Sequence, residues 1–188
     1  MKQISYTSIV VFSYNRPNLL KNLIESLKKN KEASSSKIFF FQDNYKNNRD
    51  KKDVYKCIKY INSIKGFKKK IIFVRKKNLG FYDNFIKGLK YFFSIEKKGI
   101  ILEDDLIVSE YFLKFMNQAL EKYRNKKKVW SISGWNYNIN LNFKHDAYFM
   151  RNFMSWSWAT WEDRFRRYEK NPEKIIQNWN KKKLRSLI

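Results

Sequence analysis

Apolar residues in this chain occur either in short continuous runs or at every third or fourth position of longer stretches. The short runs are rich in Ile, Val and Phe, which is typical of strands buried on both faces of a sheet. The longer stretches have the spacing of amphipathic helices. The pattern predicts strands near residues 8–13, 38–41, 71–74, 100–102 and 129–133, helices near 17–30, 54–64, 81–93, 109–124 and 161–170, and a charged loop at 47–52.

Strands and helices alternate along most of the chain. This order is typical of an α/β fold with a mostly parallel central sheet and helices on both faces. In such folds the ligand binds outside the carboxyl ends of the strands. Because no internal repeat and no linker interrupts the pattern, we expect a single domain over residues 1–188.

Three acidic residues, Glu103, Asp104 and Asp105, directly follow the apolar run at 100–102. Adjacent carboxylates raise one another's pKa, so such a cluster is costly unless a cation compensates it. Hard oxygen ligands favour Mg²⁺, Mn²⁺ or Ca²⁺. The alternative is that Asp104 and Asp105 only lead into the next helix, where acids suit the positive end of the helix dipole.

Polar residues also follow the other predicted strands. Asn15 and Arg16 lie between the first strand and the first helix, where a nucleotide would meet backbone amides and a fixed cation. Asp43 ends the second strand, where a carboxylate can accept hydrogen bonds from a base N–H or from ribose hydroxyls. Gly80 precedes a helix and allows a positive φ or a close ligand approach. The alternatives are an ordinary turn at 15–16 and an Asx turn at Asp43.

Tryptophan is concentrated in two places. Trp135 follows a glycine at the end of the fifth predicted strand, and residues 156–161 contain three tryptophans. Sugars offer C–H faces to aromatic rings, so Trp135, Trp156 and Trp158 are candidates for a sugar or acceptor platform, with packing in the core as the equal alternative. Thr160, with Asp163 three residues later, resembles a capping box for the last predicted helix.

The formal net charge of +24 favours anionic ligands such as nucleotide diphosphates, phosphorylated lipids and acidic membranes. Of the 41 basic residues, 32 are Lys and 9 are Arg, whereas specific nucleic-acid recognition favours the arginine fork. We therefore expect no specific nucleic acid, although a basic module for single-stranded nucleic acid stays an alternative. With no apolar run of about 20 residues and no signal peptide, we expect a cytoplasmic protein, peripheral to the inner face of an anionic membrane.

Several motifs together resemble a known family. They are Val11-Phe-Ser-Tyr-Asn-Arg-Pro, Phe41-Gln-Asp-Asn, Asn78-Leu-Gly, Ile101-Leu-Glu-Asp-Asp-Leu, Val129-Trp-Ser-Ile-Ser-Gly-Trp-Asn and Trp156-Ser-Trp-Ala-Thr-Trp-Glu-Asp-Arg. In this order they resemble GT-A-fold (Rossmann-like) glycosyltransferases, in particular bacterial sugar transferases related to glycosyltransferase family two and to N-acetylglucosaminyltransferase I. Each motif alone is weak, but the ordered set is specific and covers nearly the whole chain.

The resemblance implies a role for each matching residue. Asp105 would bind a divalent metal, Mn²⁺ or Mg²⁺, that bridges the donor diphosphate, with Glu103 and Asp104 near the ribose and donor sugar. Asp43 would face the base. The nucleotide and its phosphates would also lie near Ser13, Asn15, Arg16, Asn78 and Gly80. A bound metal stabilises the charge that develops on a diphosphate leaving group.

The expected activity is metal-dependent transfer of a hexosyl or N-acetylhexosaminyl group from a nucleotide-diphosphate sugar to a glycan, lipid-linked or protein acceptor, with inversion. Inversion needs a base for the acceptor hydroxyl. In the family this acid follows the tryptophan-rich segment, where Glu162 and Asp163 are the nearest acids. We therefore expect a chain that lacks part of the C-terminal acceptor region and transfers weakly. A nucleotidyltransferase is a further alternative, but residues 13–17 lack its glycine-rich basic loop.

Overall fold

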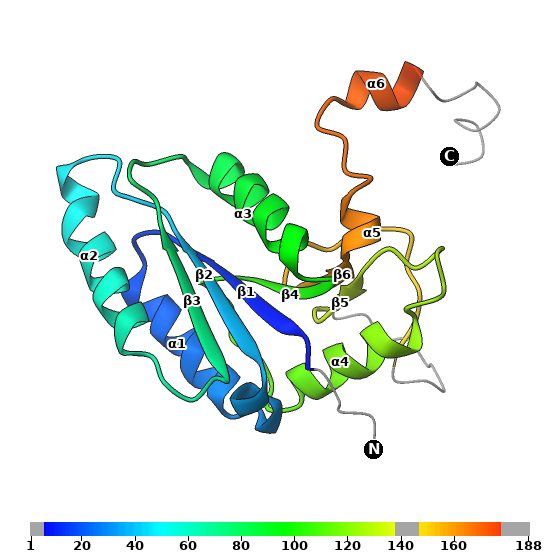
Figure 1. Cartoon of the computed structure of the whole chain (residues 1–188), viewed down its shortest axis with the longest axis horizontal. Helices are drawn as coiled ribbons and strands as arrows, with labels where there is room; N and C mark the ends of the chain where they lie inside the picture. The colour runs from blue at the N-terminus through cyan, green and yellow to red at the C-terminus, as the bar shows by residue number, and fades with distance from the viewer. Residues whose placement is uncertain (1–5, 138–146, 178–188) are drawn as a thin grey trace.

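The centre of the molecule is a mixed β-sheet, seen in Figure 1 in a computed structural model that describes residues 6–137 and 147–177. Within these residues the sheet has six strands in the order β3-β2-β1-β4-β6-β5. Strands β1 to β4 are mutually parallel, β6 is antiparallel to β4, and β5 is antiparallel to β6. The strands are β1 Ser8–Ser13, β2 Lys37–Gln42, β3 Lys69–Val74, β4 Lys98–Glu103, β5 Ile132–Ser133 and β6 Trp158–Trp161.

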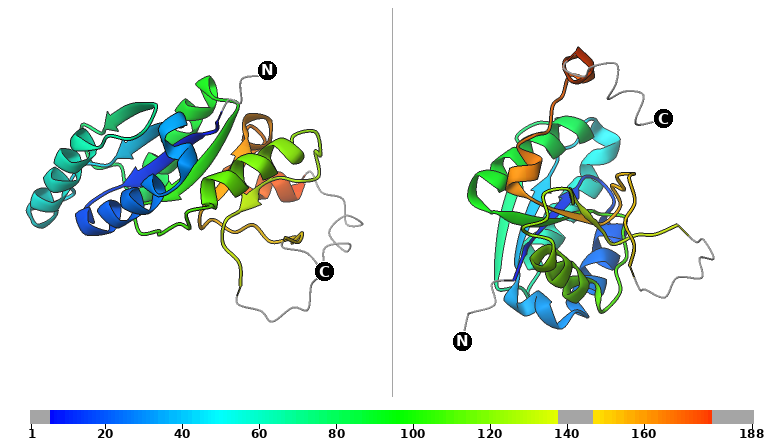
Figure 2. Two further views of the ribbon diagram at one scale, coloured as in Figure 1. Left: turned by 90° about the horizontal axis from the view of Figure 1, so that it is seen from below. Right: turned by 90° about the vertical axis from the view of Figure 1, so that its right-hand side faces the viewer.

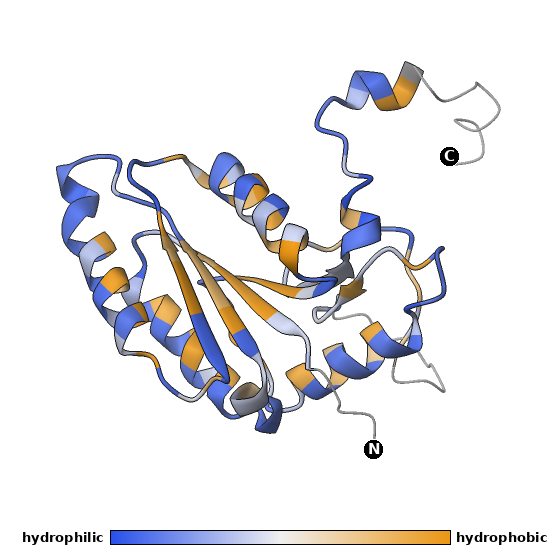
Figure 3. Ribbon diagram, viewed as in Figure 1, coloured by the Kyte–Doolittle hydropathy of each residue, from blue (hydrophilic) through white to orange (hydrophobic). Residues whose placement is uncertain are grey.

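Two apolar cores lie on opposite faces of this sheet. On one face, apolar side chains of α1 (Pro17–Lys28), α2 (Asn48–Ser63) and α4 (Phe112–Lys122) pack against alternate residues of β1, β2 and β4. On the other face, Leu89, Phe92 and Phe93 of α3 (Phe81–Ile95) pack against the residues between them. The predicted α/β fold with helices on both faces is thereby confirmed (Figures 2 and 3).

The aligned strand ends position the site. In the parallel pairs, Phe12 of β1 lies beside Glu103 of β4, and Ser13 lies beside Gln42 of β2. Strands β1, β2 and β4 therefore end at nearly the same level. The loops that follow them share the carboxyl edge of the sheet.

Three local predictions were wrong. Residues 47–52 are no loop, because the side chain of Asn47 accepts hydrogen bonds from the amides of Arg49 and Asp50 and caps α2. The predicted strand at 129–133 is reduced to β5. The predicted helix at 109–124 is α4, which begins at Phe112; the hydroxyl of Ser109 accepts from the amide of Tyr111 in the turn before it.

The predicted capping box was also wrong. Thr160 belongs to β6, where its hydroxyl donates to the carbonyl of Trp130 at 2.6 Å instead of capping a helix. The helix that follows is the short α5, Glu162–Phe165, and a further short helix, α6, spans Pro172–Gln177. A 3₁₀ helix at Lys31–Ser35 links α1 to β2. None of the described helices has the length and apolar character needed to cross a membrane.

Candidate functional site

A cavity of about 420 Å³ lies at the carboxyl edge of the sheet, above the ends of β1, β2 and β4. The structure brings together at its wall all eight residues that the sequence assigns to a nucleotide sugar. These are Ser13, Asn15, Arg16, Asp43, Asn78, Gly80, Glu103 and Asp104. They come from four separate segments of the chain, and only the parallel register of the strands places them around one space.

An arginine and two carboxylates form a charged cluster at one side of this cavity, with Arg16 and Asp104 at its wall and Asp105 beside them. Pro17 occupies the first helical position of α1, so Arg16 stands at the start of the helix. Its Nη1 donates to Oδ2 of Asp105 at 2.8 Å, and its Nη2 donates to Oδ1 of Asp104. Asp104 is buried, and its Oδ2 accepts from the amide of Tyr14 at 3.2 Å.

The acids keep an unfavourable excess of negative charge despite this arginine. Burial raises the pKa of Asp104 above its ordinary value, and Arg16 offsets this only in part. Burial and the charge of Asp105 together raise the pKa of Glu103. Burial by itself would lower the pKa of Arg16, but Asp104 and Asp105 raise it above its ordinary value. Further positive charge would therefore stabilise the ionised cluster.

Asp43 fixes the loop on the opposite side of the cavity. Its carboxylate accepts from the amides of Leu79 at 2.9 Å and Gly80 at 3.0 Å, and from Nδ2 of Asn78 at 3.3 Å. The amide of Asn44 donates to it as well, as in an Asx turn. Gly80, with φ of 75°, supplies the left-handed backbone that this loop requires. A base contact by Asp43 stays a prediction, beside the loop-forming role that these contacts describe.

Sequence reasoning missed Asp50, which holds the first loop of the site. Its carboxylate accepts from the hydroxyl of Tyr14 at 2.7 Å and from Nδ2 of Asn15 at 2.9 Å. Burial and the bond to Asp50 raise the pKa of Tyr14. An Asn at position 47 with an acid three residues later is a helix-start pattern, and that pattern could have revealed Asp50. Lys46, which lines the cavity, was missed as well.

Glu162 and Asp163, the candidate bases, lie away from this cavity. In the antiparallel pair of β4 and β6, Trp161 is beside Lys98, and the amide of Glu162 donates to the carbonyl of Lys97. The run from Lys97 to Glu103 spans about 20 Å at roughly 3.3 Å per residue. The antiparallel direction of β6 thus places both acids at the amino edge. The structure does not bring them to the acidic cluster, so the base prediction for them is corrected.

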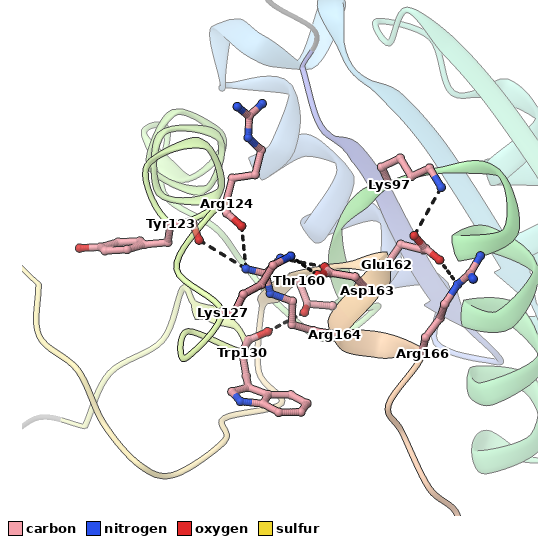
Figure 4. A network of polar contacts seen from close by, with 10 residues as sticks. All are labelled: Lys97, Tyr123, Arg124, Lys127, Trp130, Thr160, Glu162, Asp163, Arg164 and Arg166. Carbon is pink, nitrogen blue, oxygen red and sulfur yellow. Dashed lines mark hydrogen bonds and ion pairs between the residues drawn. The ribbon is translucent and has the colours of Figure 1, made fainter.

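Both acids have cationic partners at that edge (Figure 4). Glu162 pairs with Lys97 and Arg166, and Asp163 pairs with Lys127 and Arg164. The guanidinium of Arg164 is buried and donates to the carbonyl of Arg124 at 2.8 Å. These contacts attach α5 to the end of α4.

The tryptophans divide between core and surface. Trp158 is buried in β6 beside Ile101, so the platform interpretation is wrong for this residue and core packing is right. Trp156 is 52% exposed, and its ring packs edge-on against Trp135, with centroids 5.0 Å apart. Trp135 follows the end of β5, and Trp156 precedes the start of β6. These strand ends lie next to the carboxyl half of β4. This pair lies on the β5–β6 side of the acidic cluster.

The described residues offer few oxygen ligands for a metal at this edge. Among the described residues, no group of three or more His, Cys, Asp or Glu side chains converges as a metal cage. Asp105, with a side chain 41% exposed, is the accessible carboxylate. Mg²⁺ is commonly held by one or two carboxylates together with substrate phosphates, and the excess negative charge of this cluster fits such a shared site.

Comparisons with known proteins give one family and several similar folds. The model of the GNT-I family matches residues 1–155. No curated protein matches the chain. Solved structures that match include S. aureus TarS 1-349, with 16% identity over 63% of this chain and 33% of that chain, and a TM-score of 0.48. TarS 1-349 in complex with UDP-GlcNAc matches at 14% identity over 63% and 32%, also with a TM-score of 0.48. The chain thus spans about a third of the TarS 1-349 chain.

Proposed function

The chain belongs to the GNT-I family of glycosyltransferases, and from this premise we propose that it transfers a sugar from a nucleotide-diphosphate donor to a glycan, lipid-linked or protein acceptor. The observation that carries the proposal is the single cavity lined by all eight predicted nucleotide-sugar residues. The proposed donor group is a hexosyl or N-acetylhexosaminyl unit. The proposed catalytic unit is one domain over residues 1–188.

The diphosphate is proposed to lie over the ends of β1 and β4. Arg16 supplies a planar fork that suits phosphate oxygens, and Lys46 adds a second cation at the cavity wall. The amides of Leu79 and Gly80 already donate to Asp43, so they are not free for phosphate. Phosphate binding is therefore assigned to the side chains of Arg16, in the loop after β1, and Lys46, in the loop after β2.

Asp105 is proposed to hold Mn²⁺ or Mg²⁺ together with the donor diphosphate. When bound, the metal would supply Lewis-acid stabilisation of the charge on the departing diphosphate. Glu103 and Asp104 would accept from donor hydroxyls beside it. Asp43 keeps the 78–80 loop closed against the nucleoside. Reaction with inversion needs a base, and we assign no described residue to that role.

The acceptor is proposed to approach from the β5–β6 side. Trp135 and Trp156 form an aromatic pair there, and an exposed ring can stack on the apolar face of a sugar. The net charge of +24 would favour an acceptor held at an anionic membrane surface, on the cytoplasmic side.

Calorimetry with a panel of nucleotide sugars, each with and without Mn²⁺, tests the proposal. We expect one donor to bind in the micromolar range when Mn²⁺ is present and to be consumed slowly. A single-stranded oligonucleotide serves as the competing ligand. Salt-dependent binding of the oligonucleotide, with no binding of any nucleotide sugar, would contradict the proposed function and favour a nucleic-acid module.

A further inference from the structure

Arg16 lies between Asp104 and Asp105 and donates a hydrogen bond to each of them. Both oxygens of Asp104 have partners within the chain, one being Arg16 and the other the amide of Tyr14. Asp105 accepts from Arg16 through Oδ2 at 2.8 Å. The side chain of Asp104 is 2% exposed, whereas those of Arg16 and Asp105 are 43% and 41% exposed. The buried acid is fixed, and the other two groups can rearrange.

A divalent ion on Asp105 would come close to this guanidinium. Metal–oxygen distances to a carboxylate are about 2.1 Å for Mg²⁺, and Nη1 of Arg16 lies 2.8 Å from Oδ2 of Asp105, so an ion on this oxygen would lie within about 5 Å of Arg16. Two cations at that separation repel strongly in a partly buried site. A diphosphate relieves the repulsion, because its oxygens offer ligands to the metal and a second anionic partner to the arginine.

We propose that Arg16 and the divalent ion exclude one another at Asp104 and Asp105, and that a diphosphate releases the acids by drawing Arg16 onto its phosphates. Arg16 is then a positioning residue with two alternating partners. It shields the acids in the free protein and makes metal binding depend on the diphosphate. This inference rests on the proposed function, since it assigns the exchange to the donor site.

The test measures Mn²⁺ binding to the protein without nucleotide, from the electron paramagnetic resonance signal of free Mn²⁺. Arg16→Gln is expected to bind Mn²⁺ about tenfold more tightly than wild type, because the competing charge is gone. Arg124→Gln is the matched control. It removes the same charge at the amino edge, from a surface pair with Glu121, and is expected to match wild type.

Uridine diphosphate provides the second arm. With saturating uridine diphosphate, the Mn²⁺ affinities of wild type and Arg16→Gln should become similar, because Arg16 has left the acids in wild type. Without metal, Arg16→Gln should bind uridine diphosphate at least about tenfold more weakly, since it lacks the phosphate fork. If Arg16→Gln still binds Mn²⁺ about tenfold more tightly than wild type at saturating uridine diphosphate, the proposed exchange is wrong.

Arg16→Lys keeps the proposal testable if Arg16→Gln leaves Asp104 uncompensated and fails to fold. A lysine retains the charge beside Asp104 but lacks the planar fork that spans two carboxylates, so Mn²⁺ should bind roughly threefold more tightly than in wild type. Circular dichroism confirms folding of each variant. Equal Mn²⁺ affinity in wild type and the folded Arg16 variants would overturn the inference. Donor binding by wild type with Mn²⁺ tests the proposed function separately.

Discussion

The two edges of the sheet each carry acids and arginines, but they differ in how the charges are matched. At the amino edge, Glu162 and Asp163 each pair with two cations, and the contacts join α5 to α4. At the carboxyl edge, two of three neighbouring acids pair with the same arginine, Arg16, beside a cavity. A matched cluster holds elements together, whereas an unmatched cluster next to a cavity is prepared for a charged ligand.

The largest difference should come from the same substitution made at each edge. Asp105→Asn removes the accessible metal ligand, so metal-dependent turnover should fall by on the order of a hundredfold or more, at about 1.4 kcal/mol per factor of ten. Asp163→Asn should leave turnover within about twofold of wild type. Initial rates over a range of Mn²⁺ concentrations measure both. Unchanged Mn²⁺ dependence in Asp105→Asn would contradict the metal assignment.

Asp43→Ala sharpens the comparison within the carboxyl edge. It removes the acceptor for the amides of Leu79 and Gly80 and any contact of that carboxylate with the nucleoside. Uridine diphosphate should bind about 1.5–3 kcal/mol more weakly, while the affinity for Mn²⁺ should not change. Calorimetry with each ligand separates the two. If this variant binds uridine diphosphate as tightly as wild type does, Asp43 shapes the loop but does not contribute to nucleotide binding.

Arg164→Ala is the corresponding change at the amino edge. It removes the donor to the carbonyl of Arg124 and one of two donors to the carbonyl of Tyr123, which keeps the amide of Lys126, so the free energy of unfolding should fall by about 1–3 kcal/mol. Urea unfolding measures the loss. The folded variant should bind the nucleotide sugar as tightly as wild type does. A large loss of affinity for the nucleotide sugar would show that the two edges are coupled.

The smallest effect concerns the pH dependence of Asp163. Burial would raise its pKa, but the hydrogen bonds and charges of Lys127 and Arg164 lower it below the ordinary value. The ionised group therefore stabilises the fold above the ordinary pKa, and this contribution is lost as the pH falls through the lowered value. Asp163→Asn should cost about 0.2–1 kcal/mol at pH 7, and this cost should shrink progressively as the pH falls below the ordinary pKa of an aspartate. A constant difference between pH 7 and pH 2 would contradict this origin.

Most of the carboxyl edge was predictable because its eight predicted residues each follow an apolar run within a few positions, whereas Asp50, inside α2, was missed. The carboxyl ends of parallel strands lie at the same edge of a sheet. Identifying the apolar runs as parallel strands was therefore enough to predict that Arg16, Asp43 and Asp104 lie close together. The amino edge was not predictable in this way. Residues 158–161 form a short apolar run whose direction depends on pairing with β4, some 60 residues earlier, and a parallel β6 would have placed Asp163 at the opposite edge. The contact between Arg16 and Asp104 is equally long-range and became visible only in the fold.

The central place of β1 has a consequence for synthesis on the ribosome. Strand β1 emerges before both of its neighbours, β2 on one side and β4 on the other, and every residue from Ser8 to Ser13 is buried. Between the end of β2 and the end of β4 the ribosome adds about 60 residues, which takes roughly 3–12 s at 5–20 residues per second. For that time the nascent chain carries an open, apolar strand edge. A chaperone that shields such edges should raise the yield of native protein.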